Sequence, residues 1–323
     1  MADHDIEWER HEALKGPRHT YRGVKYGSVL VLLVALLYYP AGMLMVHDID
    51  DDLAYQPPAA YIGAEGSRAV AVAAGLIERE VEVNRWVAND PIFMPGALLD
   101  NMRYFQQGII AALARFAFEL TDRIGRTRGS SQVDSGLQEA AGLLQYSGTK
   151  WVFDFSTSLA PTATSEAQYR KAKNALVSYN ARIGAKDAVF DPRADNLLAT
   201  LDRMASDLGS ASAVLDRRIA EGSGLIDAKA DNVFYTIKGQ TYAYYLLLRE
   251  LEADFDVVVR DRDLTAAWQQ LLISMASAAQ LNAWVITNGE PGSLIVPNHL
   301  AEQGFYLLRA RTQLREITDI LLK

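Results

Sequence analysis

The sequence predicts an all-α protein, with one apolar helix near the N-terminus followed by a multi-helix domain. Three observations support this prediction. Residues 26–46 form an apolar run without a charge. Beyond residue 64, apolar side chains recur at intervals of three and four, which is the period of an α-helix. Only one short stretch, residues 150–165, alternates apolar and polar side chains as a strand does.

The first predicted element is the apolar run, which has 21 consecutive uncharged positions over 26–46. That length suits a helix crossing a hydrocarbon layer about 30 Å thick. Basic residues precede the run and aspartates follow it, so residues 1–25 are expected in the cytoplasm and everything beyond the helix outside it. A cleaved signal peptide is the alternative, but the apolar run continues through 43–46 and favours a retained anchor. Pro40 predicts a kink or an early end of the helix.

An acidic segment, residues 47–63, follows the apolar run. It combines aspartates at 48 and 50–52 with adjacent prolines at 57 and 58. This composition predicts an extended, solvated juxtamembrane spacer. The acids do not have the spacing of a calcium-binding loop, so no metal site is predicted there.

The remaining residues, 64–323, are predicted to form one exported helical domain. Start and stop signals divide it into eight helices. They are expected near residues 67–88, 97–124, 133–146, 165–184, 194–220, 230–259, 264–286 and 297–322. The alternating stretch 150–165 is expected to lie extended across this bundle.

Two of these helices share one sequence pattern. Residues 99–120, LDNMRYFQQGIIAALARFAFEL, align without a gap on residues 230–251, ADNVFYTIKGQTYAYYLLLREL, at an offset of 131 residues. Glycine inside a helix costs about 1 kcal/mol relative to alanine, so a repeated glycine indicates close backbone approach. We therefore expect pseudo-repeated helical corners, in which helices begin at Asp100 and Asp231 and make close contacts at Gly108 and Gly239.

The stretch WVANDPIFMPGALLDN, residues 86–101, contains the signals of one such corner. Proline after Asp90 ends one helix, and Pro95 suits the first turn of the next. Asp and Asn side chains accept hydrogen bonds from free N–H groups at a helix start. These residues predict a corner filled by Trp86, with Trp284 filling a similar one, and not a ligand site.

The composition excludes several functional classes. The 323 residues carry a formal net charge of −8, with acids spread along the chain, which argues against binding to nucleic acid. The chain has no cysteine, which excludes disulfides, thiolate zinc sites, iron–sulfur clusters and cysteine nucleophiles. No cofactor is predicted.

Candidate catalytic residues are few. Glu119 and Glu250 occupy matched positions of the repeat, and two carboxylates in one cleft can hydrolyse a glycosidic bond. Ordinary ion pairing on a helix surface explains Glu119 equally well. Ser147 and Lys150 have the Ser-x-x-Lys spacing of an acyl-enzyme but lack the strand that accompanies it. The five histidines, at positions 4, 11, 19, 47 and 299, are too scattered for a triad or a zinc pair.

Several motifs resemble the DUF2333 family of uncharacterised bacterial proteins. The motifs are Trp86, Asn-Asp-Pro at 89–91, Pro95, Leu-Asp-Asn at 99–101, Gln-Gln-Gly at 106–108, and Ala-Asp-Asn at 230–232 followed by Tyr-Ala-Tyr-Tyr at 242–245. The resemblance covers most of the chain beyond the apolar run. It implies a bacterial envelope protein, with the main domain in the periplasm of a Gram-negative cell, and it supplies no catalytic residues.

We therefore expect a single-pass protein of the bacterial inner membrane whose exported domain is a scaffold or protein-interaction module without catalytic activity. Its expected partners are the lipid bilayer, through residues 26–46, and other envelope proteins or a second copy. One alternative is a cell-wall glycan hydrolase that uses Glu119 and Glu250. The other is a small-ligand or lipid carrier that uses the tyrosines at 235, 242 and 245. A hydrolase requires facing carboxylates, and a carrier requires a large apolar cavity.

Overall fold

A computed structural model describes residues 18–63, 65–126, 133–154, 160–222, 227–283, 285–290 and 296–323. Within these ranges it contains eleven α-helices and no β-strand, and an isolated β-bridge joins Asn288 to Asn298. The all-α prediction is confirmed for this part of the chain. Residues 1–17 of the predicted cytoplasmic segment and Trp284 lie outside the described residues. The chain divides into two compact units, Met1–Val46 and His47–Lys323.

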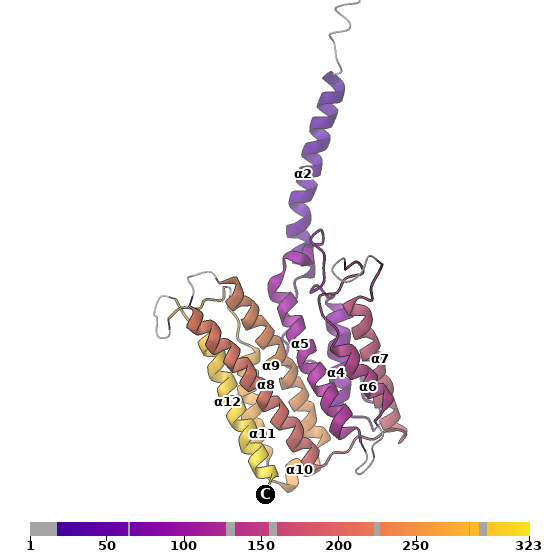
Figure 1. The fold of residues 1–323 in the computed structure, drawn as a ribbon, viewed down its shortest axis with the longest axis vertical. Coiled ribbons are helices and arrows are strands. Elements are labelled where there is room, and N and C mark those ends of the chain that lie inside the picture. Colours follow the sequence, from indigo (N-terminus) through magenta and orange to yellow (C-terminus); the bar gives the residue numbers. More distant parts are fainter. Residues whose placement is uncertain are drawn as a thin grey trace, which may run out of the picture. The chain divides into compact units, whose positions relative to one another are not determined.

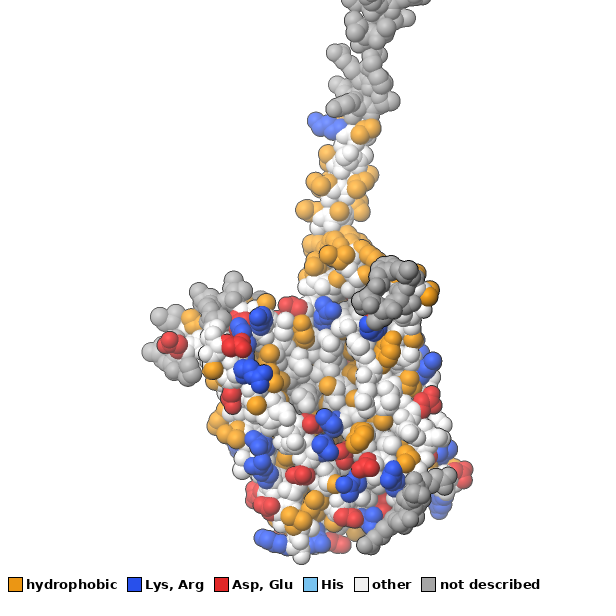
Figure 2. Space-filling view, viewed as in Figure 1, with side chains coloured by type: hydrophobic (Ala, Val, Ile, Leu, Met, Phe, Trp, Pro, Cys, Tyr) orange, Lys and Arg blue, Asp and Glu red, His pale blue; other side chains and the backbone are white. Residues whose placement is uncertain are grey.

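The first unit contains helix α2, Arg18–Val46. Its stretch Gly23–Val46 is long and apolar enough to cross a membrane, and the most apolar 18 residues of this stretch have a mean hydropathy of 2.4. Hydrophobic side chains cover much of the visible face of this helix in Figure 2. α2 continues through Pro40 to Val46, so it does not end early at the proline. A proline removes one backbone donor, and the apolar residues on both sides still favour the helix.

The second unit is a helical bundle centred on α5 (Asp100–Glu119) and α9 (Ala228–Asp254), as Figure 1 shows. One side of this pair carries α4 (Arg68–Glu78), α6 (Ser135–Leu144) and α7 (Ser165–Gly184). The other side carries α8 (Ala194–Glu221), α11 (Thr265–Ala279) and α12 (His299–Leu321). Two short helices, α3 (Ala59–Ile62) and α10 (Asp256–Asp261), complete the bundle.

All eight helices predicted beyond residue 64 are present, but three of them end or break clearly earlier than predicted. α7 has the predicted bounds, and α8 ends one residue later than predicted. The helix expected to reach residue 88 ends earlier, because α4 passes into a π-helical segment, Arg79–Val83, and the chain then turns. The helix expected over 230–259 is interrupted at Phe255, and the one expected to reach residue 286 stops at Ala279.

The two described parts of the stretch 150–165, residues 150–154 and 160–165, are joined by backbone hydrogen bonds. The backbone N–H of Thr162 donates to the carbonyl oxygen of Val152 at 2.8 Å, and that of Ser165 donates to Lys150 at 3.0 Å. Residues 155–159 lie outside the described part. The described part has no strand, so alternation of apolar side chains was not a strand signal here.

The helix start predicted at Asp100 is confirmed, and the one predicted at Asp231 is wrong. Asp100 is the first residue of α5, and its carboxylate accepts from the backbone N–H of Asn101 at 3.1 Å. α9 begins at Ala228, where the Asp227 carboxylate accepts from two backbone N–H groups, so Asp231 is not its cap. With its amide nitrogen turned toward the two aspartates, Asn101 donates to Asp100 Oδ1 at 3.2 Å and to Asp231. Burial, and then the charge of Asp100, raises the pKa of Asp231 to about 6.

α5 and α9 run parallel and cross at the two repeat glycines. A Cβ atom added to Gly108 would lie 2.0 Å from the carbonyl oxygen of Thr236. One added to Gly239 would lie 2.0 Å from the carbonyl oxygen of Phe105. These distances leave no room for a side chain on either helix. The predicted close contact of both glycines is confirmed, and the two repeated segments pack on each other.

The corner before α5 is built around Trp86, as predicted. Its side chain is fully buried, and the indole nitrogen donates to the carbonyl oxygen of Gly148 at 2.8 Å. The ring packs edge-on against Tyr169, with 5.1 Å between ring centroids. Pro95 begins a short 3₁₀ helix, Pro95–Leu98, which leads into α5. The corner therefore has a structural explanation that requires no ligand.

The acidic segment differs from the solvated spacer that its composition predicts. The side chains of Ile49, Leu53 and Tyr55 pack against the core of the bundle. Arg249, on α9, donates to the carbonyl oxygens of Leu53 and Tyr55 at 2.6 and 2.7 Å. Tyr242 donates to the carbonyl oxygen of Asp52 at 2.8 Å. Residues 49–55 therefore form part of the helical domain.

Two carboxylates of the same segment pair with cations that are buried in the bundle. Asp51 lies 2.7 Å from the ammonium group of Lys238, whose side chain is 1% exposed. Asp50 lies 3.1 Å from the guanidinium of Arg79, whose side chain is 5% exposed. A buried cation is costly unless it is paired, so these contacts hold the segment in place.

Candidate interaction groove

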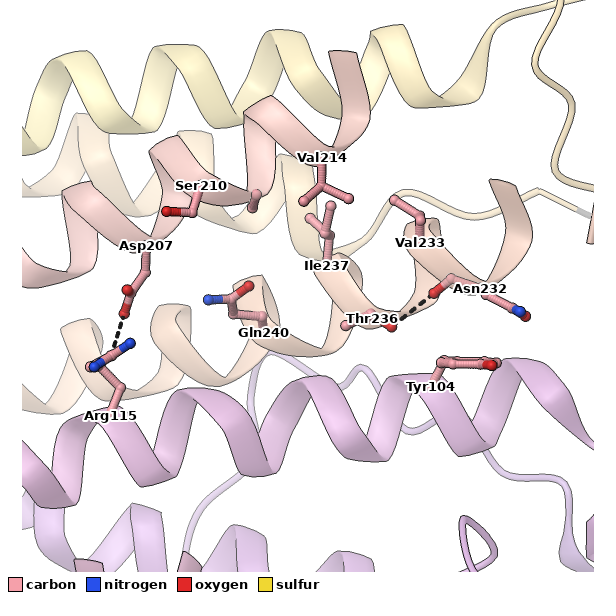
Figure 3. Close-up of a pocket in the computed structure, with 11 residues that line it drawn as sticks. Tyr104, Arg115, Asp207, Ser210, Val214, Asn232, Val233, Thr236, Ile237 and Gln240 are labelled. Atoms are coloured by element: carbon pink, nitrogen blue, oxygen red, sulfur yellow. Dashed lines mark hydrogen bonds and ion pairs between the residues drawn. The ribbon is translucent and has the colours of Figure 1, made fainter. Parts of the chain in front are cut away.

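A groove of about 400 Å³ lies between α5, α8 and α9, as Figure 3 shows. Its lining combines apolar side chains in the middle with polar side chains at the two ends. α5 contributes Tyr104 and Arg115; α8 contributes Asp207, Ser210, Ala211 and Val214; α9 contributes Asn232, Val233, Thr236, Ile237 and Gln240.

The groove exists because α8 pairs with α12 and not with α5. α8 packs along α12 and contacts α5 and α9 over much shorter stretches. α5 and α9 are held close together at Gly108 and Gly239, where no side chain separates them. The space between α8 and this pair is bordered by Val214, Val233 and Ile237. Val214 remains 43% exposed, which is unusual for an apolar side chain that faces two other helices.

An ion pair marks one end of the groove. Arg115 Nε lies 3.1 Å from Asp207 Oδ2, and the Tyr244 hydroxyl donates to the same oxygen at 2.7 Å. Burial, and then the charge of Asp207, raises the pKa of Tyr244 well above its ordinary value, so the hydroxyl stays a neutral donor. The side chain of Arg115 is 45% exposed, so its guanidinium is also available to a bound partner.

Asn232 and Tyr104 lie at the opposite end (Figure 3). The Asn232 side-chain oxygen is buried, and no described residue donates a hydrogen bond to it. A buried acceptor without a donor costs about 1–3 kcal/mol. This end of the groove is lined by the polar residues Asn232 and Tyr104.

The polar side chains of the lining have partners within the bundle. The carboxylate of Asp207 pairs with Arg115 and accepts a hydrogen bond from the Tyr244 hydroxyl. The Ser210 hydroxyl donates to the carbonyl oxygen of Ser206 at 3.1 Å, as serines inside helices commonly do. No lining residue places a base beside a nucleophile.

The two glutamates expected to serve a hydrolase face different helices. Glu119 Oε1 accepts from Arg203 Nε, on α8, at 3.1 Å. Glu250 Oε2 accepts from Arg68 Nε, on α4, at 2.7 Å, and its other oxygen pairs with Arg249. Neither glutamate lines the groove. Each ion pair gives its glutamate a role in holding two helices together.

Ser147 and Lys150 do not form the arrangement that the Ser-x-x-Lys spacing requires. Both lie in the loop after α6, so they are not one helical turn apart. The Lys150 ammonium group pairs with Asp154, and the Ser147 hydroxyl lies 3.0 Å from the Thr149 hydroxyl. The spacing is therefore coincidental.

The tyrosine-rich stretch of α9 belongs to the core. Tyr235 and Tyr242 are buried. The Tyr242 hydroxyl accepts from Arg79 at 2.7 Å and donates to the carbonyl oxygen of Asp52. Among the described residues, no group of three or more His, Asp or Glu side chains is placed to hold a metal ion. The ring of His299 lies against Thr287, with 3.0 Å between Nδ1 and the hydroxyl oxygen.

Comparison with known families gives one match. The family described as "Uncharacterized protein conserved in bacteria (DUF2333)" matches residues 60–229 and 226–323, which together cover most of the chain. The chain belongs to the DUF2333 family. The match confirms the resemblance seen in the motifs. No curated protein and no solved structure matches this DUF2333 chain.

Sequence reasoning did not find the groove of this DUF2333 protein. The sequence repeat predicts that α5 and α9 contact each other. The third wall of the groove is α8, which supplies Asp207, Ser210 and Val214 and is not part of the repeat. α8 is amphipathic, and Val214 is its one large apolar side chain that is exposed. That signal is visible only after the faces of the helix have been assigned.

Proposed function

We propose that this DUF2333 protein is a single-pass inner-membrane protein whose helical domain lies in the periplasm and binds another envelope protein in the groove between α5, α8 and α9. Helix α2 supplies the anchor. Its apolar stretch is preceded by Arg18, Arg22 and Lys25 and followed by four aspartates among residues 48–52, which supports a cytoplasmic N-terminus.

The observation that carries the binding function is the groove itself. It is open along helices, apolar in the middle and polar at its ends. An amphipathic helix of a partner matches this pattern, because its apolar face would cover Val214, Val233 and Ile237. Its polar flanks would meet Arg115 at one end and the side chains of Tyr104 and Asn232 at the other.

Anchoring supports the same function. Proteins held in one membrane meet at a raised effective concentration, so a modest interface is occupied without a large buried area. A groove of about 400 Å³ is modest in this sense. The membrane anchor and the groove are therefore complementary parts of one interaction module.

A photo-crosslinker placed at Val214 in living cells should capture a specific envelope protein. Val214 lines the groove, whereas Asp216 is exposed two residues later, on the opposite side of α8. We expect the adduct from position 214 and not from position 216. Val214→Asp should lower, several-fold, the same adduct formed from a crosslinker at Gln240, because a carboxylate disfavours the apolar contact. Equal adducts from both faces of α8, or none from the groove, would contradict the proposal.

A lipid or another apolar ligand is the second candidate occupant. The volume of the groove lies within the roughly 300–1,000 Å³ range typical of small-molecule sites. The same crosslinkers distinguish the two candidates, because a lipid adduct changes the mass of the protein by far less than a protein adduct. The hydrolase alternative has weaker support, since Glu119 and Glu250 are each engaged by an arginine.

The topology has its own test. The full-length protein should remain in membranes after extraction at alkaline pH, because α2 is held by the hydrocarbon layer. Protease added to the periplasmic side of spheroplasts should digest the helical domain and leave a fragment that ends near Val46. Release into the soluble fraction, or protection of the whole chain, would show that the proposed anchor or orientation is wrong.

A further inference from the structure

Exposed apolar side chains gather at the end of the bundle where α5 begins. Ile92, Phe93 and Leu98, from the turn before α5, are 80%, 55% and 54% exposed. The Phe93 ring packs edge-on against Trp151, with 5.6 Å between centroids, and Trp151 packs against Phe153 at 5.8 Å. We call these five residues the apolar rim. Large apolar side chains grouped on a surface commonly mark a contact site.

The apolar rim stands on an ordered base. The backbone N–H groups of Met94 and Ala97 donate within the turn, at 2.8 and 3.1 Å. The Asn89 side chain joins the two halves of the rim by donating to the carbonyl oxygen of Lys150 at 2.8 Å. Pro95 and Gly96 are buried beneath the turn. The outward direction of the rim side chains is therefore fixed by the fold.

The chain enters the helical domain at the same end. The backbone N–H of Asp48 donates to the sulfur of Met102, in the first turn of α5, at 3.4 Å. His47 and Asn101 line one cavity, and Leu98 lies three residues before Asn101. His47 directly follows Val46, the last residue of α2. One residue spans at most about 3.6 Å, so a bilayer that holds α2 is within reach of this end of the domain.

We propose that the apolar rim inserts into the interfacial layer of the bilayer that holds α2. The inference rests on the anchoring role proposed for that helix. Tryptophan and phenylalanine side chains suit the level of the lipid headgroups. Two cations near the rim are paired, Arg85 with Asp90 at 3.5 Å and Lys150 with Asp154, so the rim offers apolar area and little net charge. Insertion should therefore not require acidic lipids.

The chain has no cysteine, so a single label can be placed cleanly. Phe93→Cys carries a nitrobenzoxadiazole fluorophore in the full-length protein, reconstituted into phosphatidylcholine vesicles with or without nitroxide-labelled lipids. The control is Val257→Cys, which is 58% exposed on α10, beyond the far end of α9. Emission from position 93 should shift to the blue and be quenched several-fold more strongly by nitroxide lipids than emission from position 257. Ile92→Cys should reproduce the result.

Three outcomes would overturn the proposal and tell its parts apart. If the unlabelled protein does not float with vesicles, the anchor fails and the rim proposal fails with it. If the protein floats but the label at position 93 is quenched by aqueous iodide and not by nitroxide lipids, the rim alone is wrong. If the label is shielded only at high protein density in the vesicles, the rim contacts a second copy and not lipid.

Discussion

Gly108→Ala should lower the free energy of unfolding of the helical domain by about 2–3 kcal/mol, although it adds a single methyl group. The new Cβ would lie 2.0 Å from the carbonyl oxygen of Thr236 and 2.9 Å from the backbone nitrogen of Gln240. Both obstacles are backbone atoms, which cannot rotate away as a side chain can. α5 and α9 must therefore move apart, and the side chains packed along both helices lose contacts.

The matched control is Gly142→Ala on α6, where nothing lies within 4 Å of an added Cβ. There, alanine should raise the free energy of unfolding by up to about 1 kcal/mol, because it favours the helix over glycine. Urea unfolding of the full-length protein in detergent, followed by circular dichroism, measures both changes. Gly239→Ala should behave as Gly108→Ala does, and the double variant should cost less than the two single costs added together, because one separation of the helices relieves both clashes. An unchanged midpoint for Gly108→Ala would show that α5 and α9 do not cross at the glycines.

Arg79→Met should lower the free energy of unfolding by about 3–5 kcal/mol, the cost typical of breaking a buried ion pair. The guanidinium lies 2.8 Å from the carboxylate of Glu80, whose side chain is fully buried. It also lies over the rings of Tyr55 and Tyr242, 4.8 and 5.1 Å from their centroids. Methionine retains some of the packing but leaves the Glu80 carboxylate buried without its cation.

The loss should depend on pH in a defined direction. Burial raises the pKa of Glu80, and Arg79 is the largest influence that lowers it. Without Arg79 the folded-state pKa rises further above the unfolded value. The folded state of the variant therefore binds a proton more readily than the unfolded state, and its stability falls as pH rises through the folded pKa. The deficit should be smaller at pH 5 than at pH 8.

Two further variants test the explanation: a compensating substitution at Glu80 and a control at an exposed arginine. Glu80→Gln in the Arg79→Met background should recover part of the stability and remove the extra pH dependence of the variant, because no unpaired charge remains at position 80. Arg260→Met on α10 breaks an exposed pair with Asp256 and should cost at most about 0.5 kcal/mol. If Arg79→Met is no more damaging than Arg260→Met, then the buried pair does not hold the acidic segment and α4 in place.

The sequence predicted the helices well where local signals decide their length. α7 has the predicted bounds because threonine caps its start, and its apolar residues keep one period throughout. The end of α9 is different. Asp254 accepts from the backbone of Arg68 and Ala69, at the start of α4, and the next residue leaves the helix. Its partners lie almost 190 residues earlier in the chain, so no residue near Asp254 in the sequence predicts that the helix ends there.

The prediction of a solvated spacer at residues 47–63 fails for the same physical reason, which is contact with residues distant in the chain. Its aspartates and prolines resemble a solvated linker when only neighbouring residues are considered. The partners that hold it, Arg79, Lys238 and Arg249, are contributed by α9 and by the segment after α4. Composition describes what a segment can bury by itself, and here the bundle supplies the compensating charges.

The groove is harder to predict from the sequence than the helices are, because it depends on how the helices pack together. The repeat identified two helices that cross at glycines, and that prediction is confirmed. The groove depends on α8 packing along α12, which is a choice among tertiary partners. An amphipathic pattern shows that one face of α8 is buried, but it does not show whether α12 or α5 covers that face.

The pairing of α5 with α9 also sets the order in which the chain can fold. The two helices are separated by about 110 residues, and a ribosome adding roughly 5–20 residues per second takes several seconds or more to supply α9 after α5 is complete. During that interval the narrow face around Gly108 has no partner, and neighbouring apolar residues such as Phe105 and Ile109 remain exposed. Such a chain depends on the cell to keep it from aggregating until its second half arrives. Truncation before residue 228 should therefore yield a protein that is degraded or insoluble, even though α4 to α8 are complete.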